Sequence, residues 1–120
     1  MMKILIIDDE GPDRKGMAVA LARDGFTDVI LADTADAGFE MAKSFQPDVI
    51  LIDVVLKEMN GLDVCRNIRK IKDLKAKIIM ITGHLDAVDA KNATSSGADE
   101  IIEKTIGFSN IGQTIRELTG

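Results

Sequence analysis

The sequence predicts an α/β fold in which five parallel strands alternate with helices. Five apolar runs of strand length recur along the chain, at 4–7, 29–32, 49–52, 78–81 and 101–102. Stretches with the spacing of amphipathic helices lie between them. In three runs four successive residues are apolar, which is typical of parallel strands covered by helices on both sides. We therefore predict a doubly wound, open five-stranded sheet with right-handed crossovers.

The composition of the runs also predicts their places in the sheet. The runs 4–7, 49–52 and 78–81 have no polar face, so we expect them at its centre. The runs 29–32 and 101–102 are shorter or flanked by acidic residues, which favours edge strands.

Helices are predicted between the strands because apolar residues recur there one helical turn apart. The recurring residues are Met17 and Leu21; Ala35, Phe39 and Ala42; Leu62, Cys65 and Ile68; Leu85 and Val88; and Ile111, Ile115 and Leu118. Residues that favour helix ends agree with this division. Pro12 suits a first turn, Thr34 and Ser109 suit N-caps, and Gly25 and Gly97 suit positions after helix ends.

Length and charge limit the classes of protein that the chain can belong to. We expect a single domain over residues 1–120, since that length suits one hydrophobic core. A net charge of −5 opposes nonspecific binding to nucleic acids or anionic membranes. The only cysteine, Cys65, cannot form an intrachain disulfide, and no signal peptide or membrane segment is recognisable, so we expect a cytoplasmic protein.

Reactive side chains stand where the predicted strands end. Asp8 and Asp9 follow the first run, Asp53 the third, Thr82 the fourth and Lys104 the fifth. Two carboxylates ~4 Å apart repel by about 4 kcal/mol at an effective dielectric near 20, so three acids together need raised pKa values or a cation. Single acids there would simply cap the next helix, but a pair facing a third favours Mg²⁺, which prefers oxygen ligands.

Several segments carry a family resemblance. They are KILIIDDE at 3–10, PDVILID at 47–53, MNG at 59–61, IMITG at 79–83 and GADEIIEK at 97–104. Together, and in this order, they resemble the receiver domain of two-component response regulators over essentially all 120 residues. The resemblance implies a flavodoxin-like sheet with strand order 2-1-3-4-5.

The resemblance also implies a role for each residue of the site. Asp53 is expected to take a phosphoryl group from a phosphohistidine of a sensor histidine kinase or histidine phosphotransfer protein. For Mg²⁺, Asp9 is the expected direct ligand, Asp8 acts through bound water, and the Val55 carbonyl completes the set with Asp53.

The remaining site residues are expected to contact the phosphoryl group. Thr82 and Lys104 each reach a phosphoryl oxygen, because positioned donors and positive charge stabilise phosphoryl transfer. The chain would then be no enzyme but a phosphoacceptor signalling domain that catalyses only its own phosphorylation and dephosphorylation.

The implied partners are proteins. An unknown downstream protein is expected to dock on the surface around 85–98 and 111–118, with no direct nucleic-acid or membrane binding. Dimerisation linked to phosphorylation stays open.

Three positions depart from the family pattern. Thr105 replaces the usual proline after the lysine, so we predict a trans Lys104–Thr105 peptide. Lys57 replaces a second proline and should loosen its loop, and Ile101 stands where an aromatic switch residue is expected. The open alternative is a pseudo-receiver, a protein-interaction module that acts without phosphorylation.

Other phosphate chemistries fit less well. A flavodoxin-like cofactor site would need phosphate-binding donors after the first strand, where this chain has carboxylates. A haloacid dehalogenase-type phosphatase would need an acid at Val55, and a nucleotide-binding P-loop would need a lysine at Met17.

Overall fold

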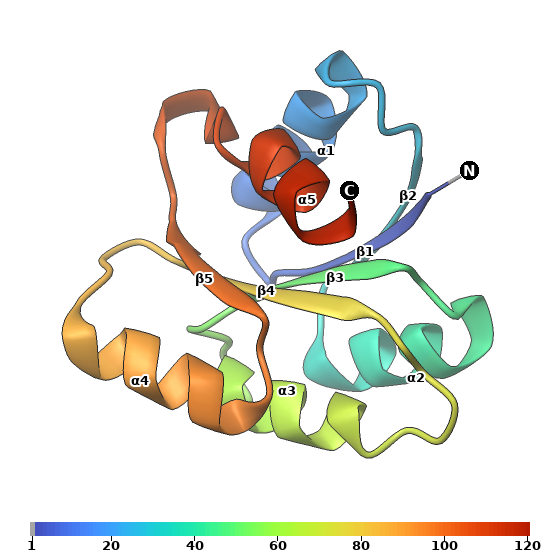
Figure 1. Cartoon of the computed structure of the whole chain (residues 1–120), viewed down its shortest axis with the longest axis vertical. Coiled ribbons are helices and arrows are strands. Elements are labelled where there is room, and N and C mark those ends of the chain that lie inside the picture. The colour runs from blue at the N-terminus through green and yellow to red at the C-terminus, as the bar shows by residue number, and fades with distance from the viewer. Residues whose placement is uncertain (1) are drawn as a thin grey trace.

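The computed structural model describes residues 2–120, which form a five-stranded parallel sheet between two layers of helices (Figure 1). The strands are β1 (Lys3–Ile7), β2 (Asp28–Ala32), β3 (Val49–Asp53), β4 (Lys77–Thr82) and β5 (Glu100–Glu103). Their order is β2-β1-β3-β4-β5, so the predicted fold class, strand order and edge strands are confirmed.

Five helices connect or follow the strands. They are α1 (Gly11–Arg23), α2 (Ala35–Phe45), α3 (Gly61–Arg69), α4 (Ala87–Ser96) and α5 (Ile111–Thr119), with a short 3₁₀ turn, η1 (Ile106–Phe108), before the last. In Figure 1, α1 and α5 cover one face of the sheet, and α2, α3 and α4 cover the other. Among residues 2–120, no helix combines the length and the apolar character that crossing a membrane requires.

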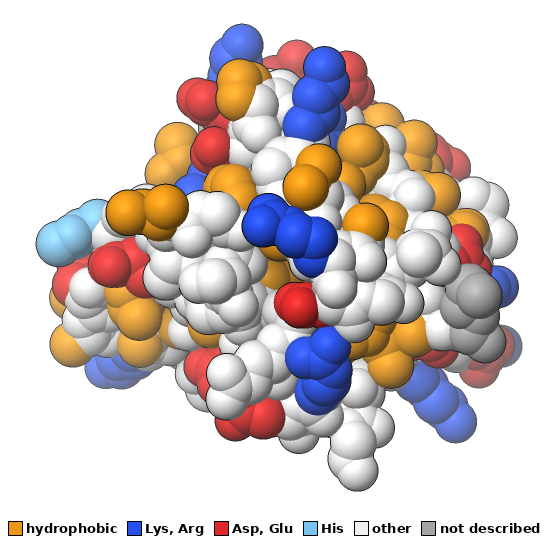
Figure 2. All heavy atoms as spheres, turned by 90° about the horizontal axis from the view of Figure 1, so that it is seen from above, with side chains coloured by type: hydrophobic (Ala, Val, Ile, Leu, Met, Phe, Trp, Pro, Cys, Tyr) orange, Lys and Arg blue, Asp and Glu red, His pale blue; other side chains and the backbone are white. Residues whose placement is uncertain are grey.

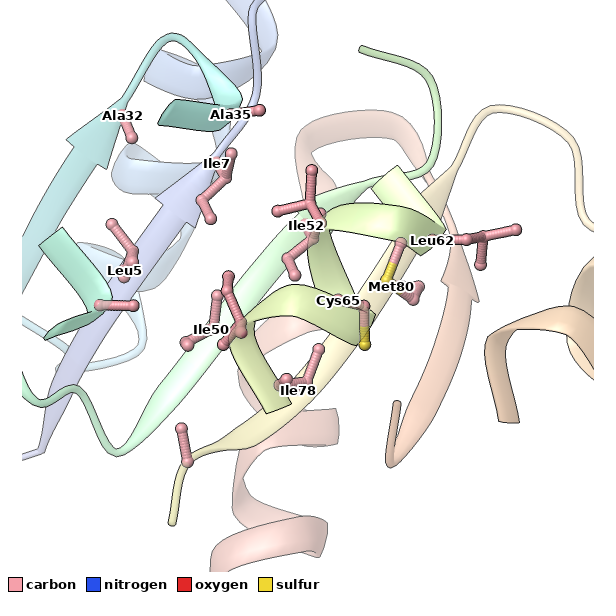
Figure 3. Packing of buried hydrophobic residues seen from close by; sticks show 14 of the residues in the cluster. Leu5, Ile7, Ala32, Ala35, Ile50, Ile52, Leu62, Cys65, Ile78 and Met80 are labelled. Atoms are coloured by element: carbon pink, nitrogen blue, oxygen red, sulfur yellow. The ribbon is translucent and has the colours of Figure 1, made fainter. Parts of the chain in front are cut away.

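The core consists of two apolar layers, one on each face of the sheet. Alternation along β1 sends Ile4 and Ile6 toward α1 and α5, and Leu5 and Ile7 toward α2 and α3. Figure 3 shows the second layer, in which Cys65 of α3 packs among residues of the central strands. The predicted buried runs are confirmed, since every residue of 4–7, 49–52 and 78–81 is fully buried.

Most of the predicted helix ends are confirmed. Pro12 lies in the first turn of α1, and Gly97 ends α4 with a φ of 101°. Gly25, with a φ of 91°, lies just beyond the end of α1. A positive φ is a conformation that glycine adopts without the steric cost of a side chain.

Two local predictions were wrong. Ser109 does not cap α5, because η1 intervenes and the helix begins one residue later, after Asn110. Leu85 is not part of α4, which begins at Ala87, and its side chain is partly exposed in the preceding loop. Apolar spacing suggested Leu85 but does not mark the late start of α4, and residue type suggested the cap at Ser109 but does not reveal the intervening turn.

The N-cap of α2 provides a test of local stability. The Thr34 hydroxyl accepts a hydrogen bond from the Ala37 N–H at 3.0 Å, which satisfies one of the free donors of the first turn. We expect Thr34→Ala to lower the free energy of unfolding by about 1 kcal/mol, measured by urea denaturation. Thr34→Ser retains a hydroxyl that can cap the helix and should therefore keep most of that stability. Equal losses in both variants would contradict a capping role.

Candidate functional site

The site lies at the carboxyl edge of the sheet, where the central strands end side by side. Asp53 is the last residue of β3 and pairs in register with Ile81 of β4. Asp8 directly follows β1, and Lys104 directly follows β5. The parallel topology thus brings together residues that are up to 96 positions apart, from 8 to 104.

Asp8 is a fully buried carboxylate with one oxygen free of hydrogen bonds. Its Oδ1 accepts from the Glu10 N–H at 2.9 Å, whereas Oδ2 has no hydrogen-bond partner. Burial raises the pKa of Asp8 to about 6, and the charge of Asp53 adds to this, although the Glu10 N–H and the Lys104 charge oppose it. A buried, unpartnered oxygen of this kind favours a bound cation or proton.

Asp53 is held on both of its oxygens and is only 4% exposed. Oδ1 accepts from the Val55 N–H at 2.9 Å, and Oδ2 accepts from Lys104 Nζ at 2.8 Å. These two bonds fix the direction of the carboxylate at the open end of the sheet.

Lys104 is the cation of the site. Its N–H donates to the Thr82 carbonyl at 2.8 Å, which extends the pairing of β4 and β5 to this residue. Its ammonium lies 2.8 Å from Asp53 Oδ2 and 3.5 Å from Asp8 Oδ2. Burial lowers the pKa of Lys104, but hydrogen bonds to Asp13 and Asp53 and the charges of Asp53 and Asp8 outweigh it, so the pKa is raised.

Asp13 is a member of the site that sequence reasoning missed. It lies in the first turn of α1, and its Oδ2 accepts from Lys104 Nζ at 2.7 Å. Carboxylate oxygens of Asp8, Asp13 and Asp53 all lie within 4.8 Å of one another. An acid in a first helical turn is usually explained by the helix dipole, so the sequence carried no signal for a role at a distant lysine.

Asp9 lies outside this three-acid group, which was found among the described residues 2–120. Its Oδ2 accepts from the Lys57 N–H at 2.6 Å, and it lines a surface hollow with Arg14. A proline at 57 has no N–H to donate, so this bond depends on the departure from the family pattern. The predicted loosening of this loop stays a prediction.

Thr82 and Val55 lie beside the acids. Thr82 is 5% exposed, and its hydroxyl donates to the His84 carbonyl at 3.2 Å, toward the loop that follows β4. Val55 lies two residues beyond Asp53, with its N–H on that carboxylate and its side chain exposed. The structure therefore brings the predicted residues to one edge, with the Thr82 hydroxyl turned to its own loop.

The family model of the response regulator receiver domain matches residues 4–116. The chain belongs to this family. Among curated relatives, the DNA-binding response regulator MtrA of Mycolicibacterium paratuberculosis is 34% identical over 102 residues, covering 85% of this chain and 44% of that protein. The transcriptional regulatory protein AfsQ1 of Streptomyces coelicolor is 32% identical over 106 residues, covering 88% and 46%. The chain thus spans less than half the length of these relatives.

Solved structures show the same fold. A CheY-like response regulator receiver domain from Methanospirillum hungatei superimposes with a TM-score of 0.87 at 25% identity, covering 98% of this chain and 93% of that one. The chemotaxis protein CheY4 of Vibrio cholerae superimposes with a TM-score of 0.90 at 23% identity, covering 98% of both chains.

The acidic pocket of this receiver domain suits a hard divalent cation. Receiver domains typically bind Mg²⁺, and here the carboxylates of Asp8, Asp13 and Asp53 lie together, with one buried Asp8 oxygen that lacks a hydrogen-bond donor. Mg²⁺ takes oxygen ligands and usually keeps several waters, so one or two of these carboxylates suffice to hold it. The residues present therefore fit the cation that the family implies.

The other two departures from the receiver pattern have clear structural outcomes. None of the peptide bonds among residues 2–120 is cis, so the predicted trans bond between Lys104 and Thr105 is confirmed. Ile101, at the position of the expected aromatic switch, is 9% exposed and packs in the layer beneath the sheet with Ala93 of α4. A buried aliphatic side chain there, which is smaller than an aromatic ring, leaves little surface for a rotamer change to alter.

Proposed function

We propose that this receiver domain accepts a phosphoryl group on Asp53 and thereby switches its binding to a partner protein. The supporting observation is the Asp53 carboxylate itself, which ends a central strand beside the Lys104 ammonium at 2.8 Å. The family match and the acidic pocket support the same reading.

The proposed step is a direct transfer between two proteins. A carboxylate oxygen of Asp53 attacks the phosphorus of a phosphohistidine, the P–N bond breaks, and the imidazole leaves with the bond electrons and takes up a proton. Asp53 needs no general base because the carboxylate is already the nucleophile. The Lys104 ammonium balances the charge on the phosphoryl oxygens, and Thr82 contributes its hydroxyl once this turns from His84.

We propose Asp8 and Asp53, with Asp9 and the Val55 carbonyl, as the residues that hold Mg²⁺. When bound, the cation offsets the mutual repulsion of the acids and the charge of the incoming phosphoryl group. Asp8 contributes a buried oxygen with no hydrogen bond to lose. Asp9 must give up its bond to the Lys57 N–H before it can take part.

Proteins are the proposed partners: a sensor histidine kinase or histidine phosphotransfer protein as donor, and a downstream protein. The surface over 85–98 and 111–118 offers Leu85, 37% exposed, and Val88, 66% exposed, to such a protein. Figure 2 shows the face that carries α1 and α5, where acidic, basic and hydrophobic side chains are interspersed. Mixed charge and a net charge of −5 favour a protein partner over nucleic acid.

The pseudo-receiver alternative is favoured by one observation: the Asp9 carboxylate is bound to the Lys57 N–H instead of facing the other acids. In that case the chain would bind its partners without Mg²⁺ or phosphorylation.

Phosphorylation of the intact chain tests the proposal. We expect acetyl phosphate, or phosphotransfer from candidate kinases, to add one phosphoryl group only when Mg²⁺ is present, detected by intact-protein mass spectrometry. The product should be an acyl phosphate, which hydroxylamine cleaves. If Mg²⁺ changes neither the NMR shifts nor the thermal stability and no phosphate is gained, the pseudo-receiver reading replaces the proposal.

A further inference from the structure

The Lys104 ammonium forms ion pairs with Asp8, Asp13 and Asp53, and Asp13 is the one of these that was not predicted from the sequence. Its ammonium lies 2.7 Å from Asp13 Oδ2 and 2.8 Å from Asp53 Oδ2. The Lys104 side chain is 18% exposed and that of Asp13 is 32% exposed, so water screens this pair only partly. The ammonium is therefore shared between the proposed phosphoacceptor and helix α1.

We propose that Asp13 is a positioning residue that strengthens cation binding in this site and opposes the phosphoryl group. This inference rests on the proposed function, because it concerns the affinities of the same pocket for Mg²⁺ and for a phosphoryl group. It assigns Asp13 a role that is distinct from those of Asp8, Asp9 and Asp53.

The effect on the cation follows from charge and from the place that Asp13 gives to Lys104. Asp8 has a carboxylate oxygen within 4.8 Å of those of Asp13 and Asp53, and its Oδ2, which has no hydrogen-bond partner, lies 3.5 Å from Lys104 Nζ. A divalent cation that binds beside Asp8 and Asp53 repels the nearby ammonium. Asp13 adds a negative charge that attracts the cation. It also holds the Lys104 ammonium on the side of α1, away from the cation, so both contributions favour cation binding.

The effect on the phosphoryl group has the opposite sign. A lysine ammonium has three donors, and in this structure Asp13 and Asp53 each occupy one. A phosphoryl group on Asp53 must draw Lys104 toward its own oxygens while the Asp13 carboxylate competes for the ammonium. Asp13 also repels the phosphoryl anion directly, because like charges at this range are unfavourable.

A simpler role for Asp13 is to stabilise the first turn of α1 by its charge. Asp36 likewise lies in the first turn of a helix, α2, is exposed, and lies outside the acid group. Asp36→Asn therefore removes an equal charge from the first turn of another helix and is the control for Asp13→Asn.

The test measures two affinities on the full chain as wild type, Asp13→Asn and Asp36→Asn. Mg²⁺ binding is measured alone by calorimetry, and beryllofluoride, a phosphoryl mimic, is titrated at Mg²⁺ concentrations that saturate each protein. We expect Asp13→Asn to weaken Mg²⁺ binding about tenfold, as for a unit charge removed at 4–6 Å, and to tighten beryllofluoride binding severalfold. Asp36→Asn should change neither affinity, and thermal unfolding checks that each variant is folded.

The outcomes separate this inference from the proposed function. If the wild type binds both ligands and the two affinities of Asp13→Asn do not move in opposite directions, the role of Asp13 is refuted while the proposed function stands. A purely structural role would weaken both affinities together. If the wild type binds neither ligand, the proposed function fails and this inference fails with it.

Discussion

Asp53→Asn should reduce phosphorylation from acetyl phosphate or a cognate kinase by more than about 100-fold, because it removes the nucleophile and with it the covalent step. The amide keeps the Oδ1 acceptor for the Val55 N–H, at 2.9 Å in the wild type, so the loop after β3 should stay in place. The variant loses the charge that repels Asp8, and it loses the Oδ2 acceptor of the Lys104 ammonium, which an amide NH₂ cannot replace. The measurement is the fraction of phosphorylated protein over time by mass spectrometry.

The control for this prediction is Asp36→Asn, which changes the net charge equally at an exposed position away from the site. It should take up phosphate at the wild-type rate. If Asp53→Asn were phosphorylated as fast as the wild type, and the phosphoryl group mapped to another residue, the phosphoacceptor would lie elsewhere.

Gly61→Ala should destabilise the fold by about 3 kcal/mol, the upper range for inserting an atom into a packed site. A Cβ at Gly61 would lie 2.0 Å from the Asp53 carbonyl oxygen and 2.9 Å from Val54 Cα. Both contacts are with backbone, which cannot turn away as a side chain could. The Gly61 N–H also donates to the Val54 carbonyl at 2.8 Å, so the start of α3 is tied to the chain that carries Asp53.

Gly11→Ala is the matched control, because Gly11 is likewise the first residue of a helix. Its Cβ would meet only the Arg14 side chain, at 3.8 Å. We expect Gly11→Ala to leave the free energy of unfolding unchanged or to raise it by up to about 1 kcal/mol. Both glycine variants are measured by urea denaturation. If Gly61→Ala were as stable as Gly11→Ala, the close approach between α3 and β3 would not exist in solution.

The sequence predicted the sheet because burial on both faces leaves a local pattern. Fully apolar runs such as 4–7 and 49–52 are needed wherever helices cover both sides of a strand. Asp8, Asp9, Asp53 and Lys104 were also visible, since each lies within two residues of the end of a predicted strand, whereas Asp13 does not. Helix starts were harder: the cap at Thr34 was found, but the turn at η1 that displaced Ser109 has no periodic marker.

What the sequence by itself determined is the set of strands and the side chains at their ends, because both depend on neighbours along the chain. Only the tertiary structure decided how the charges pair. It pairs Asp13 with Lys104, 91 residues away, and it directs the Asp9 carboxylate to accept a hydrogen bond from the Lys57 N–H. Electrostatic partners are chosen by distance in space, and the directions of two side chains at a sheet edge depend on loops that no local pattern specifies.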